Sequence, residues 1–166
     1  NKRRKYSDYA LRLEEKQKIR VHYGLREEQL RRFIRNSKKG AAANWVNKLI
    51  GLLERRLDNL VFRLGFAGSI RAARQLVSHG HIMVDGKKVT VGSFVVPQGG
   101  KISINAKSLE NQIVLQASRA PRLEVPDYLR KESEAEGIVQ AIPGTEHVPF
   151  AFDAGLFTEY YAARKA

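Results

Sequence analysis

The stretch Ser69–Val91, SIRAARQLVSHGHIMVDGKKVTV, decides the fold that we predict for this chain. Its first half has the features of a short helix. Ser69 is a suitable N-cap, because its hydroxyl can accept a hydrogen bond from an amide of the first turn. Gly80 stands where a residue in the left-handed conformation would end the helix after His79. Helical spacing then aligns an apolar stripe of Ile70, Ala73 and Val77.

The second half of the stretch has the alternation of a β-hairpin. Asp85-Gly86 favours a type I′ turn, in which both central residues have positive φ. The flanking strands place apolar side chains at alternate positions, namely Ile82, Val84, Val89 and Val91. The stretch therefore predicts a helix followed by a two-stranded hairpin.

A basic and hydrogen-bonding surface is expected on this unit. Arg71, Arg74, Gln75 and Ser78 repeat the helical spacing on a face other than the apolar stripe. Such a face is often only solvated. Here the helix end and the hairpin add four more basic or polar side chains, His79, His81, Lys87 and Lys88, with only Asp85 opposing them. This composition favours contact with the phosphate backbone of RNA or DNA.

The net charge is distributed unevenly along the chain, with the positive charge in its first two thirds. Of the net charge of +13 over 166 residues, residues 1–40 carry +9, residues 41–107 carry +7 and residues 108–166 carry −3. Such a gradient favours a polyanionic partner for the first two thirds of the chain. No run of 18 apolar residues occurs, so we expect no membrane partner. Without cysteine, disulfides and thiolate metal sites are excluded.

The flanks of the stretch are mostly helical by pattern. A basic arm, NKRRK at 1–5, precedes a helix capped by Ser7 that runs to about Tyr23, and further helical regions are expected at 25–39 and from 45 to about 65. After the hairpin we expect strands at 93–96 and 101–104, then a helix capped by Ser108. The aromatic C-terminus, PFAFDAGLFTEYYAARKA, needs a core, and we expect the N-terminal helices to provide it.

At the level of families, the run RLDNLVFRLGFAGSIRAARQLVSHGHIMVDGKKVTVGSF, 56–94, resembles the RNA-binding module of small-subunit ribosomal protein four. Related modules occur in some pseudouridine synthases, bacterial tyrosyl-tRNA synthetases and a small heat-shock RNA-binding protein. Before the module, SDYALRLEEKQKIRVHYGLREEQLRRF resembles the helical segment of the ribosomal family. After it, GLFTEYYAARKA resembles that family's C-terminal end. The flanks therefore favour the ribosomal family, bacterial or organellar in type.

The sequence also contains features of three alternatives to this resemblance. Arg56-Leu57-Asp58 matches the pseudouridine synthase motif whose Asp is the nucleophile, but it lies inside the module, and too little chain follows for a catalytic domain. We expect Asp58 to be a helix-surface or capping partner of a nearby arginine. A free-standing factor of the heat-shock type would lack the preceding helical domain. His79-Gly80-His81 without a third ligand makes a weak metal site.

The fold class that we expect is α+β. It combines an N-terminal helical rRNA-binding domain at 1–53, completed by 108–166, with a small αβ RNA-binding module at 54–107. The module has two helices packed on a short, mostly antiparallel sheet, and the C-terminal tail returns to the helical domain.

By resemblance, we expect the chain to be a non-enzymatic constituent of the small ribosomal subunit, in the cytoplasm or an organelle, that binds 16S-type rRNA directly, helps nucleate assembly and contributes to translational accuracy. The partners implied are this rRNA, small-subunit ribosomal protein five, and messenger RNA where it enters the ribosome. No cofactor and no metal are expected. The candidate RNA-binding residues are Arg3, Arg4, Lys5, Tyr6, Lys16, Lys18, Arg20, Arg56, Arg63, Ser69, Arg71, Arg74, Gln75, His79, His81, Lys87 and Lys88.

Overall fold

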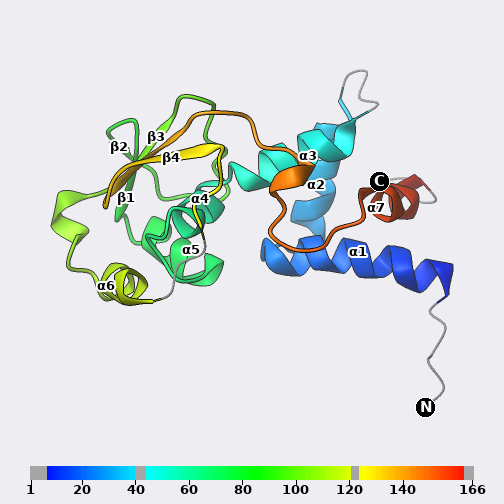
Figure 1. Ribbon diagram of the computed structural model, residues 1–166, viewed down its shortest axis with the longest axis horizontal. Coiled ribbons are helices and arrows are strands. Elements are labelled where there is room, and N and C mark those ends of the chain that lie inside the picture. The colour runs from blue at the N-terminus through cyan, green and yellow to red at the C-terminus, as the bar shows by residue number, and fades with distance from the viewer. Residues whose placement is uncertain (1–6, 40–43, 121–123, 163–166) are drawn as a thin grey trace, which may run out of the picture. The chain divides into compact units, whose positions relative to one another are not determined.

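The computed structural model describes residues 7–39, 44–120 and 124–162 of the chain. The described residues divide into two compact units. The first comprises those within 1–50 and 144–166, and the second those within 51–143. A helical first unit and a second unit of helices and strands together confirm the α+β class (Figure 1). No helix of the described residues is both long enough and apolar enough to span a membrane.

The first unit is helical. Its elements are α1 (Asp8–His22), α2 (Glu27–Ser37), the first part of α3 (Trp45–Glu54), the 3₁₀ turn η2 (Thr145–His147) and α7 (Ala154–Ala162). The expected cap of α1 is present, since Ser7 Oγ accepts a hydrogen bond from the Ala10 amide at 3.1 Å. The helix ends close to the expected Tyr23, and Gly24 follows it with φ of 61°.

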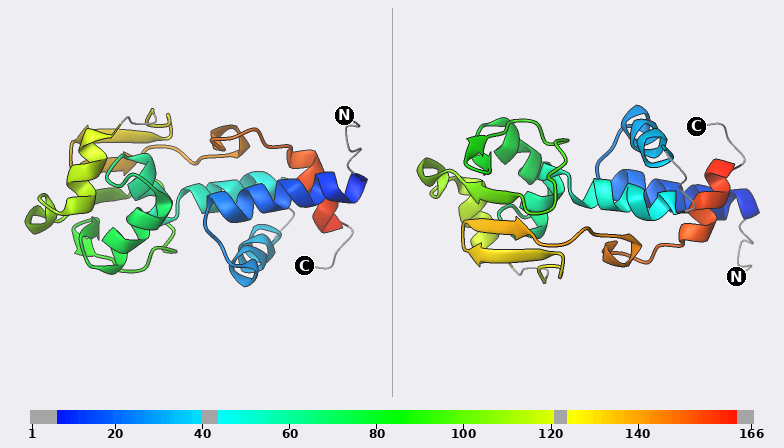
Figure 2. Two further views of the ribbon diagram at one scale, coloured as in Figure 1. Left: turned by 90° about the horizontal axis from the view of Figure 1, so that it is seen from below. Right: turned by 90° about the horizontal axis from the view of Figure 1, so that it is seen from above.

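The C-terminal tail supplies much of the core of the first unit. Helix α7 packs against α1, and the two lie side by side in Figures 1 and 2. Phe157 is fully buried, and Tyr160 and Tyr161 are almost so. The Trp45 ring lies 5.9 Å from the Phe157 ring. Burying one such side chain is worth roughly 1.5–3 kcal/mol, so the tail is held by its aromatic residues. This confirms the expected return of the tail to the helical domain.

The second unit contains the helix and hairpin of the deciding stretch. Its helices are α4 (Leu57–Arg63), α5 (Ile70–Ser78), the 3₁₀ turn η1 (Ala106–Ser108) and α6 (Gln112–Arg119). Its strands are β1 (Ile82–Val84), β2 (Lys87–Lys88), β3 (Lys101–Ile104), β4 (Leu129–Ser133) and β5 (Glu136–Val139). The strands form one sheet in the order β2-β1-β3-β5-β4, and every neighbouring pair is antiparallel. In Figure 1 helices α4, α5 and α6 lie below this sheet.

The cap, the helix end and the turn of the deciding stretch are confirmed, but the return strand β2 is limited to Lys87–Lys88, and Val91 is exposed outside it. Ser69 Oγ accepts a hydrogen bond from the Ala72 amide at 3.0 Å, and Gly80 takes φ of 81° just after the helix. Asp85 and Gly86 have φ of 50° and 79°, as a type I′ turn requires. The core of the unit lies between α4, α5 and the sheet, and includes Leu57, Leu60, Ala73, Leu76, Val77, Ile82 and Ile102.

The sequence pattern did not predict the boundary between α3 and α4. One helical region was expected from 45 to about 65, but Arg56 is extended, with ψ of 140°, and divides it. The segment 92–96 causes this break. Its carbonyls at Phe94 and Gly92 accept hydrogen bonds from the amides of Leu57 and Asp58, at 2.8 and 3.1 Å. These bonds satisfy amides of the first turn of α4. Residues 93–96 therefore pair with the start of a helix, and in place of the expected strand they form a single bridge, Arg56 with Val95.

The expected helix cap at Ser108 is also displaced. Ser108 ends the 3₁₀ turn η1, and α6 begins after Asn111, whose Oδ1 accepts from the Ile113 amide at 2.9 Å. Leu109 and Glu110 separate the two elements. The asparagine side chain therefore provides the cap that the serine had been expected to provide.

The expected domain division differs from the structure for residues 108–143. We had placed them with the helical domain, but β4 and β5 extend the sheet of the second unit. Gly137 allows this docking, because a Cβ there would lie 2.5 Å from Leu64 Cδ2. Tyr128 reinforces it by donating a hydrogen bond to the buried Glu54 carboxylate at 2.7 Å. Only residues from 144 onward belong with the first unit.

Tyr128 generates a testable pH dependence. Burial, and then the neighbouring Glu54 carboxylate, raise the pKa of the Tyr128 phenol above its ordinary value. The folded state therefore keeps the proton, whereas the unfolded chain releases it above pH ~10. The stabilisation is complete below that pH and is lost as the pH rises further.

We expect the free energy of unfolding to fall more steeply above pH ~10 in the wild type than in Tyr128→Phe, as measured by urea unfolding followed by circular dichroism. Tyr9→Phe is the control, because Tyr9 is 50% exposed and should keep the wild-type slope. Equal slopes in all three proteins would contradict the assignment.

Candidate nucleic-acid interface

One face of α5 is polar and exposed along its whole length. The face opposite is fixed in the core, where Ile70, Ala73, Leu76 and Val77 are buried. This anchoring turns four polar side chains to solvent, namely Arg71, Gln75, Ser78 and His79. Helical spacing therefore produces a continuous polar face that ends at the C-terminus of α5.

The β1–β2 hairpin continues this face. Lys87 and Lys88 form β2, the edge strand, and both are exposed. A Cβ placed on Gly80 would lie 3.5 Å from Lys88 Nζ, so the lysine reaches across the end of α5. Among the described residues Asp85 makes no ion pair with either lysine, and its Oδ1 accepts from the Lys101 amide at 2.9 Å on the neighbouring strand.

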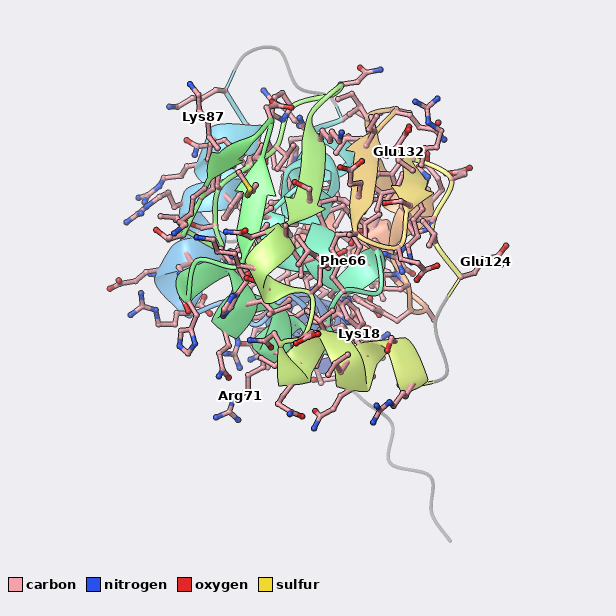
Figure 3. The ribbon with its side chains drawn as sticks, turned by 90° about the vertical axis from the view of Figure 1, so that its left-hand side faces the viewer. Lys18, Phe66, Arg71, Lys87, Glu124 and Glu132 are labelled. Atoms are coloured by element: carbon pink, nitrogen blue, oxygen red, sulfur yellow. The ribbon has the colours of Figure 1, made fainter. Side chains whose placement is uncertain are left out.

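Three cations of this surface are available to a ligand. Arg71, Lys87 and Lys88 make no ion pair with any other residue that the structure describes. Figure 3 shows Arg71 and Lys87 toward one side of the second unit, and Glu124 and Glu132 toward the other. We call the set Arg71, Gln75, His79, Lys87 and Lys88 the module face.

Asp58 connects the module face to the interior. Its carboxylate is 1% exposed and lies between two arginines. Arg56 donates to it through Nε at 3.2 Å and Nη2 at 2.9 Å, and Arg74 donates through Nε at 2.8 Å. Asp58 Oδ1 also accepts from the Asn59 amide at 2.7 Å. Asp58 is therefore a partner of nearby arginines, as expected, but it is buried, whereas a position at the helix surface had been one expectation.

Two arginines of the expected RNA-binding set are internal. The side chain of Arg56 is 3% exposed and that of Arg63 is 8% exposed. Arg63 Nε lies 3.3 Å from the carboxylate of Glu54, which is fully buried. Because both guanidinium groups are engaged beneath the surface, we do not include them among the contacts proposed for RNA.

His81 also has a structural position. Its Nδ1 lies 2.7 Å from Ser108 Oγ, and its Nε2 lies 3.3 Å from Asn111 Nδ2. Asn111 uses its Oδ1 as the cap of α6, so its Nδ2 is the donor to the ring. The ring then donates from Nδ1 to Ser108. His81 thus joins β1 to the start of α6, whereas His79 remains exposed.

The expected cations of α1 are largely engaged within the first unit. Lys16 is buried, with Nζ 2.6 Å from Glu27 Oε1. Lys18 pairs with Glu15 at 2.7 Å, and this hydrogen bond raises the pKa of its amine. Arg20 donates to Gln17 at 2.7 Å. The remaining expected residues of the N-terminal arm, Arg3, Arg4, Lys5 and Tyr6, lie outside the described residues.

The sequence analysis missed exposed cations on α2. The spacings Glu27–Arg31 and Glu28–Arg32 each permit an intrahelical ion pair. Only the first is formed among the described residues, at 3.6 Å. Arg32 and Arg35 are exposed, three residues apart, and that spacing was the signal available in the sequence.

The described residues do not bring together three His, Cys, Asp or Glu side chains in a group that could hold a metal ion. Of the His79-Gly80-His81 motif, His81 has side-chain neighbours at both ring nitrogens. The site is therefore a surface of cations and hydrogen-bonding groups, and its chemistry suits binding of a polyanion.

Comparison with known proteins identifies similar chains over nearly the whole length. The family model described as the S4 domain matches residues 55–102, and that of the ribosomal protein S4/S9 N-terminal domain matches residues 1–54. The small ribosomal subunit protein uS4B of Bdellovibrio bacteriovorus is 55% identical over 165 residues, covering 98% of this chain and 79% of the relative. The uS4 protein of Methylobacillus flagellatus is 46% identical, covering 99% of this chain and 80% of the relative.

The Asp58 cluster generates a stability prediction. Asp58→Asn removes the charge that compensates Arg56 in the interior, and breaking a buried ion pair in this way costs about 3–5 kcal/mol. Glu136→Gln is the matched control, because its pair with Lys101 is 45% and 40% exposed and should be worth at most about 1 kcal/mol. Urea unfolding measures both free energies. Equal losses in the two variants would contradict a special role for Asp58.

Proposed function

Because the chain belongs to the small ribosomal subunit protein uS4 family, we propose that it is a constituent of the small ribosomal subunit that binds 16S-type rRNA through the module face. The observation that carries this proposal is the exposure of Arg71, Lys87 and Lys88 without ion pairs among the described residues. Exposed, uncompensated cations on a rigid helix and hairpin are suited to neutralising phosphates.

The proposed mode of recognition is shape and phosphate contact. A-form RNA presents its phosphates and 2′-hydroxyls, while its base edges lie in a deep and narrow major groove. Arg71, Lys87 and Lys88 would neutralise phosphates. Gln75 and His79 would add directional hydrogen bonds, and Ser69, whose oxygen already caps α5, retains its hydroxyl proton as a donor. Arg74 would contribute from an orientation fixed by Asp58.

The wider role that we propose rests on family membership. The chain would bind rRNA early, help nucleate assembly of the subunit, lie beside messenger RNA where it enters the ribosome, and contribute to the accuracy of translation. Its location would be the ribosome of the cytoplasm or of an organelle. Reconstitution of the subunit with and without the chain, followed by measurement of misreading, tests this role.

The enzymatic alternative is not favoured. The uS4 family is a family of ribosomal structural proteins. In the structure the Asp of Arg56-Leu57-Asp58 is 1% exposed and bound by two arginines, so it offers no nucleophile to a substrate. We therefore propose that the chain has no pseudouridine synthase activity. Formation of pseudouridine by the purified chain, and its loss in Asp58→Asn, would overturn this proposal.

The module face generates a binding prediction. We assume that Arg71, Lys87 and Lys88 each neutralise one phosphate. Replacing all three with Gln should then reduce the slope of log K against log salt by about 2–3, because each phosphate contributes roughly 0.7–0.9 to that slope. The measurement is the affinity for a small-subunit rRNA transcript over a range of salt. Lys101→Gln is the control, because Lys101 is exposed but paired with Glu136. An unchanged slope in a folded triple variant would move the interface elsewhere.

A protein partner is proposed for the opposite edge of the sheet. Residues 124–139 carry five acidic and two basic side chains. Glu132 pairs with Arg130 and Glu134 with Lys131, but Glu134 is 86% exposed and the segment keeps an acidic excess. Such an edge repels phosphates, so we propose that the β4–β5 hairpin faces a basic protein, small-subunit ribosomal protein five. This assignment combines the charge of the hairpin with the partner expected for the family.

Charge reversal tests that partner. Glu132→Lys with Glu134→Lys should weaken binding of purified ribosomal protein five while leaving the affinity for rRNA undiminished, because the module face is unaltered. Glu110→Lys provides a control, being an exposed acidic residue of the same unit outside the hairpin. Loss of rRNA affinity in the double variant, with binding of protein five intact, would contradict the assignment.

A further inference from the structure

The turn between β1 and β2 contains a chemically reactive dipeptide. Asp85-Gly86 is the one place in the sequence where an aspartate or an asparagine precedes glycine. In such a pair the backbone nitrogen of the glycine can attack the side-chain carboxyl carbon of the aspartate, because glycine has no Cβ to obstruct the approach. The hairpin favours this pair, since both central positions of a type I′ turn have positive φ, here 50° and 79°. The conformation that forms the turn therefore also selects a reactive sequence.

The turn is exposed and can open without disturbing the core. Asp85 and Gly86 are both exposed. Apart from chain neighbours, no heavy atom of the described residues lies within 4 Å of the position that a Cβ on Gly86 would take. Strand β2 forms an edge of the sheet and pairs with β1 only through Lys87 and Lys88. Because short and solvent-exposed elements open at low free-energy cost, the backbone of the turn has access to other conformations.

One side of the turn is nevertheless held by β3. The Asp85 amide donates to the Lys101 carbonyl at 2.9 Å, and Asp85 Oδ1 accepts from the Lys101 amide at 2.9 Å. Strand β3 is itself fixed, because it pairs with β5 on its other side. While these bonds persist, the carboxyl group of Asp85 is not free to rotate toward the Gly86 nitrogen. The folded hairpin therefore slows an attack that opening of the turn permits.

We infer that Asp85-Gly86 is a site of spontaneous isoaspartate formation. The Gly86 nitrogen loses its proton and bonds to Asp85 Cγ, and one carboxyl oxygen leaves as water, so that a cyclic succinimide forms. Water then adds to one of the two carbonyl carbons of the ring. Opening at Cγ restores aspartate, whereas opening at the backbone carbonyl carbon leaves the chain linked through the side chain. The net reaction is an isomerisation, and it needs no reagent other than water.

The isomer displaces the two lysines of the module face. Linkage through the side chain inserts a methylene group into the backbone of the turn, and in hairpins the turn fixes the register of the strands. The register here pairs Met83 with Lys88 and Val84 with Lys87. Net charge does not change, because isoaspartate carries a carboxylate as aspartate does. Weaker binding of the isomer would therefore report the position of the lysines, a consequence that rests on the proposed rRNA-binding function.

The test keeps the full chain at neutral pH and physiological temperature and follows two of its tryptic peptides. Peptide 75–87 contains Asp85 and no other aspartate or asparagine, and peptide 123–130 contains Asp127 alone. Chromatography separates the isomer, whose mass is unchanged, and an isoaspartyl methyltransferase labels it. We expect the isomer to accumulate in 75–87 and not in 123–130, because the exposed Asp127 precedes the bulky Tyr128.

Two variants and unfolding separate the chemistry from the fold. Gly86→Asn keeps a residue that tolerates positive φ but adds a Cβ beside the attacking nitrogen, so formation of the isomer should fall several-fold. Asp85→Asn keeps a preferred type I′ sequence and should react faster, with loss of ammonia and a measurable gain in mass. The wild-type chain in urea should form the isomer faster than the folded chain, because the bonds to Lys101 are lost. Circular dichroism confirms that each variant is folded.

Partition of the aged chain on an immobilised small-subunit rRNA transcript measures the consequence for binding. The unbound fraction should be enriched several-fold in the isomer. Its slope of log K against log salt should be lower than that of the fresh chain by up to about 1.4–1.8, since each of two phosphates contributes roughly 0.7–0.9.

The outcomes distinguish this inference from the proposed function. Absence of the isomer from peptide 75–87 of the folded chain would overturn the inference and leave the proposed function intact. An isomer divided evenly between bound and unbound fractions would contradict the displacement of the lysines. A fresh chain that does not bind the transcript would overturn the proposed function, whereas the peptide analysis decides the isomerisation by itself.

Discussion

The second unit depends on the ion pairs that the Asp58 carboxylate makes with two arginines. This carboxylate is removed from water and bound by Arg56 and Arg74, which come from the start of α4 and from the middle of α5. The loop that covers it is also fitted to it, because a Cβ on Gly92 would lie 3.5 Å from Asp58 Oδ2. A buried charge left without its partners is strongly unfavourable, so helix, helix and loop are stable only together.

This constraint also separates structural cations from those that can bind a ligand. Acidic residues inside the molecule, Asp58 and Glu54, hold Arg56, Arg63 and Arg74. Within the described residues, Arg71, Lys87 and Lys88 lack such partners. Net charge therefore overstates the surface available for RNA. The relevant quantity is the number of exposed cations that are not paired with the buried carboxylates.

The strand order of the sheet places basic and acidic side chains on opposite edges of the second unit. The order, β2-β1-β3-β5-β4, places the two lysines of β2 on one edge and the acidic β4–β5 hairpin on the other. The opposition arises from strand order and not from sequence distance, because β3 pairs with β1 and β5 on its two sides. A single small unit can thus present unlike surfaces to a nucleic acid and to a protein.

The sequence by itself determined those features whose causes are local. Ser69, Gly80 and Asp85-Gly86 specify a cap, a helix end and a turn through bonds and φ angles of neighbouring residues, and the family resemblance was carried by contiguous motifs. Tertiary structure decided the rest, because burial and ion pairing join residues distant in the chain. It placed residues 108–143 in the second unit through Tyr128 and Gly137. It also buries Arg56 and Arg63 and leaves Arg32 exposed. Charge and helical spacing alone do not predict this difference.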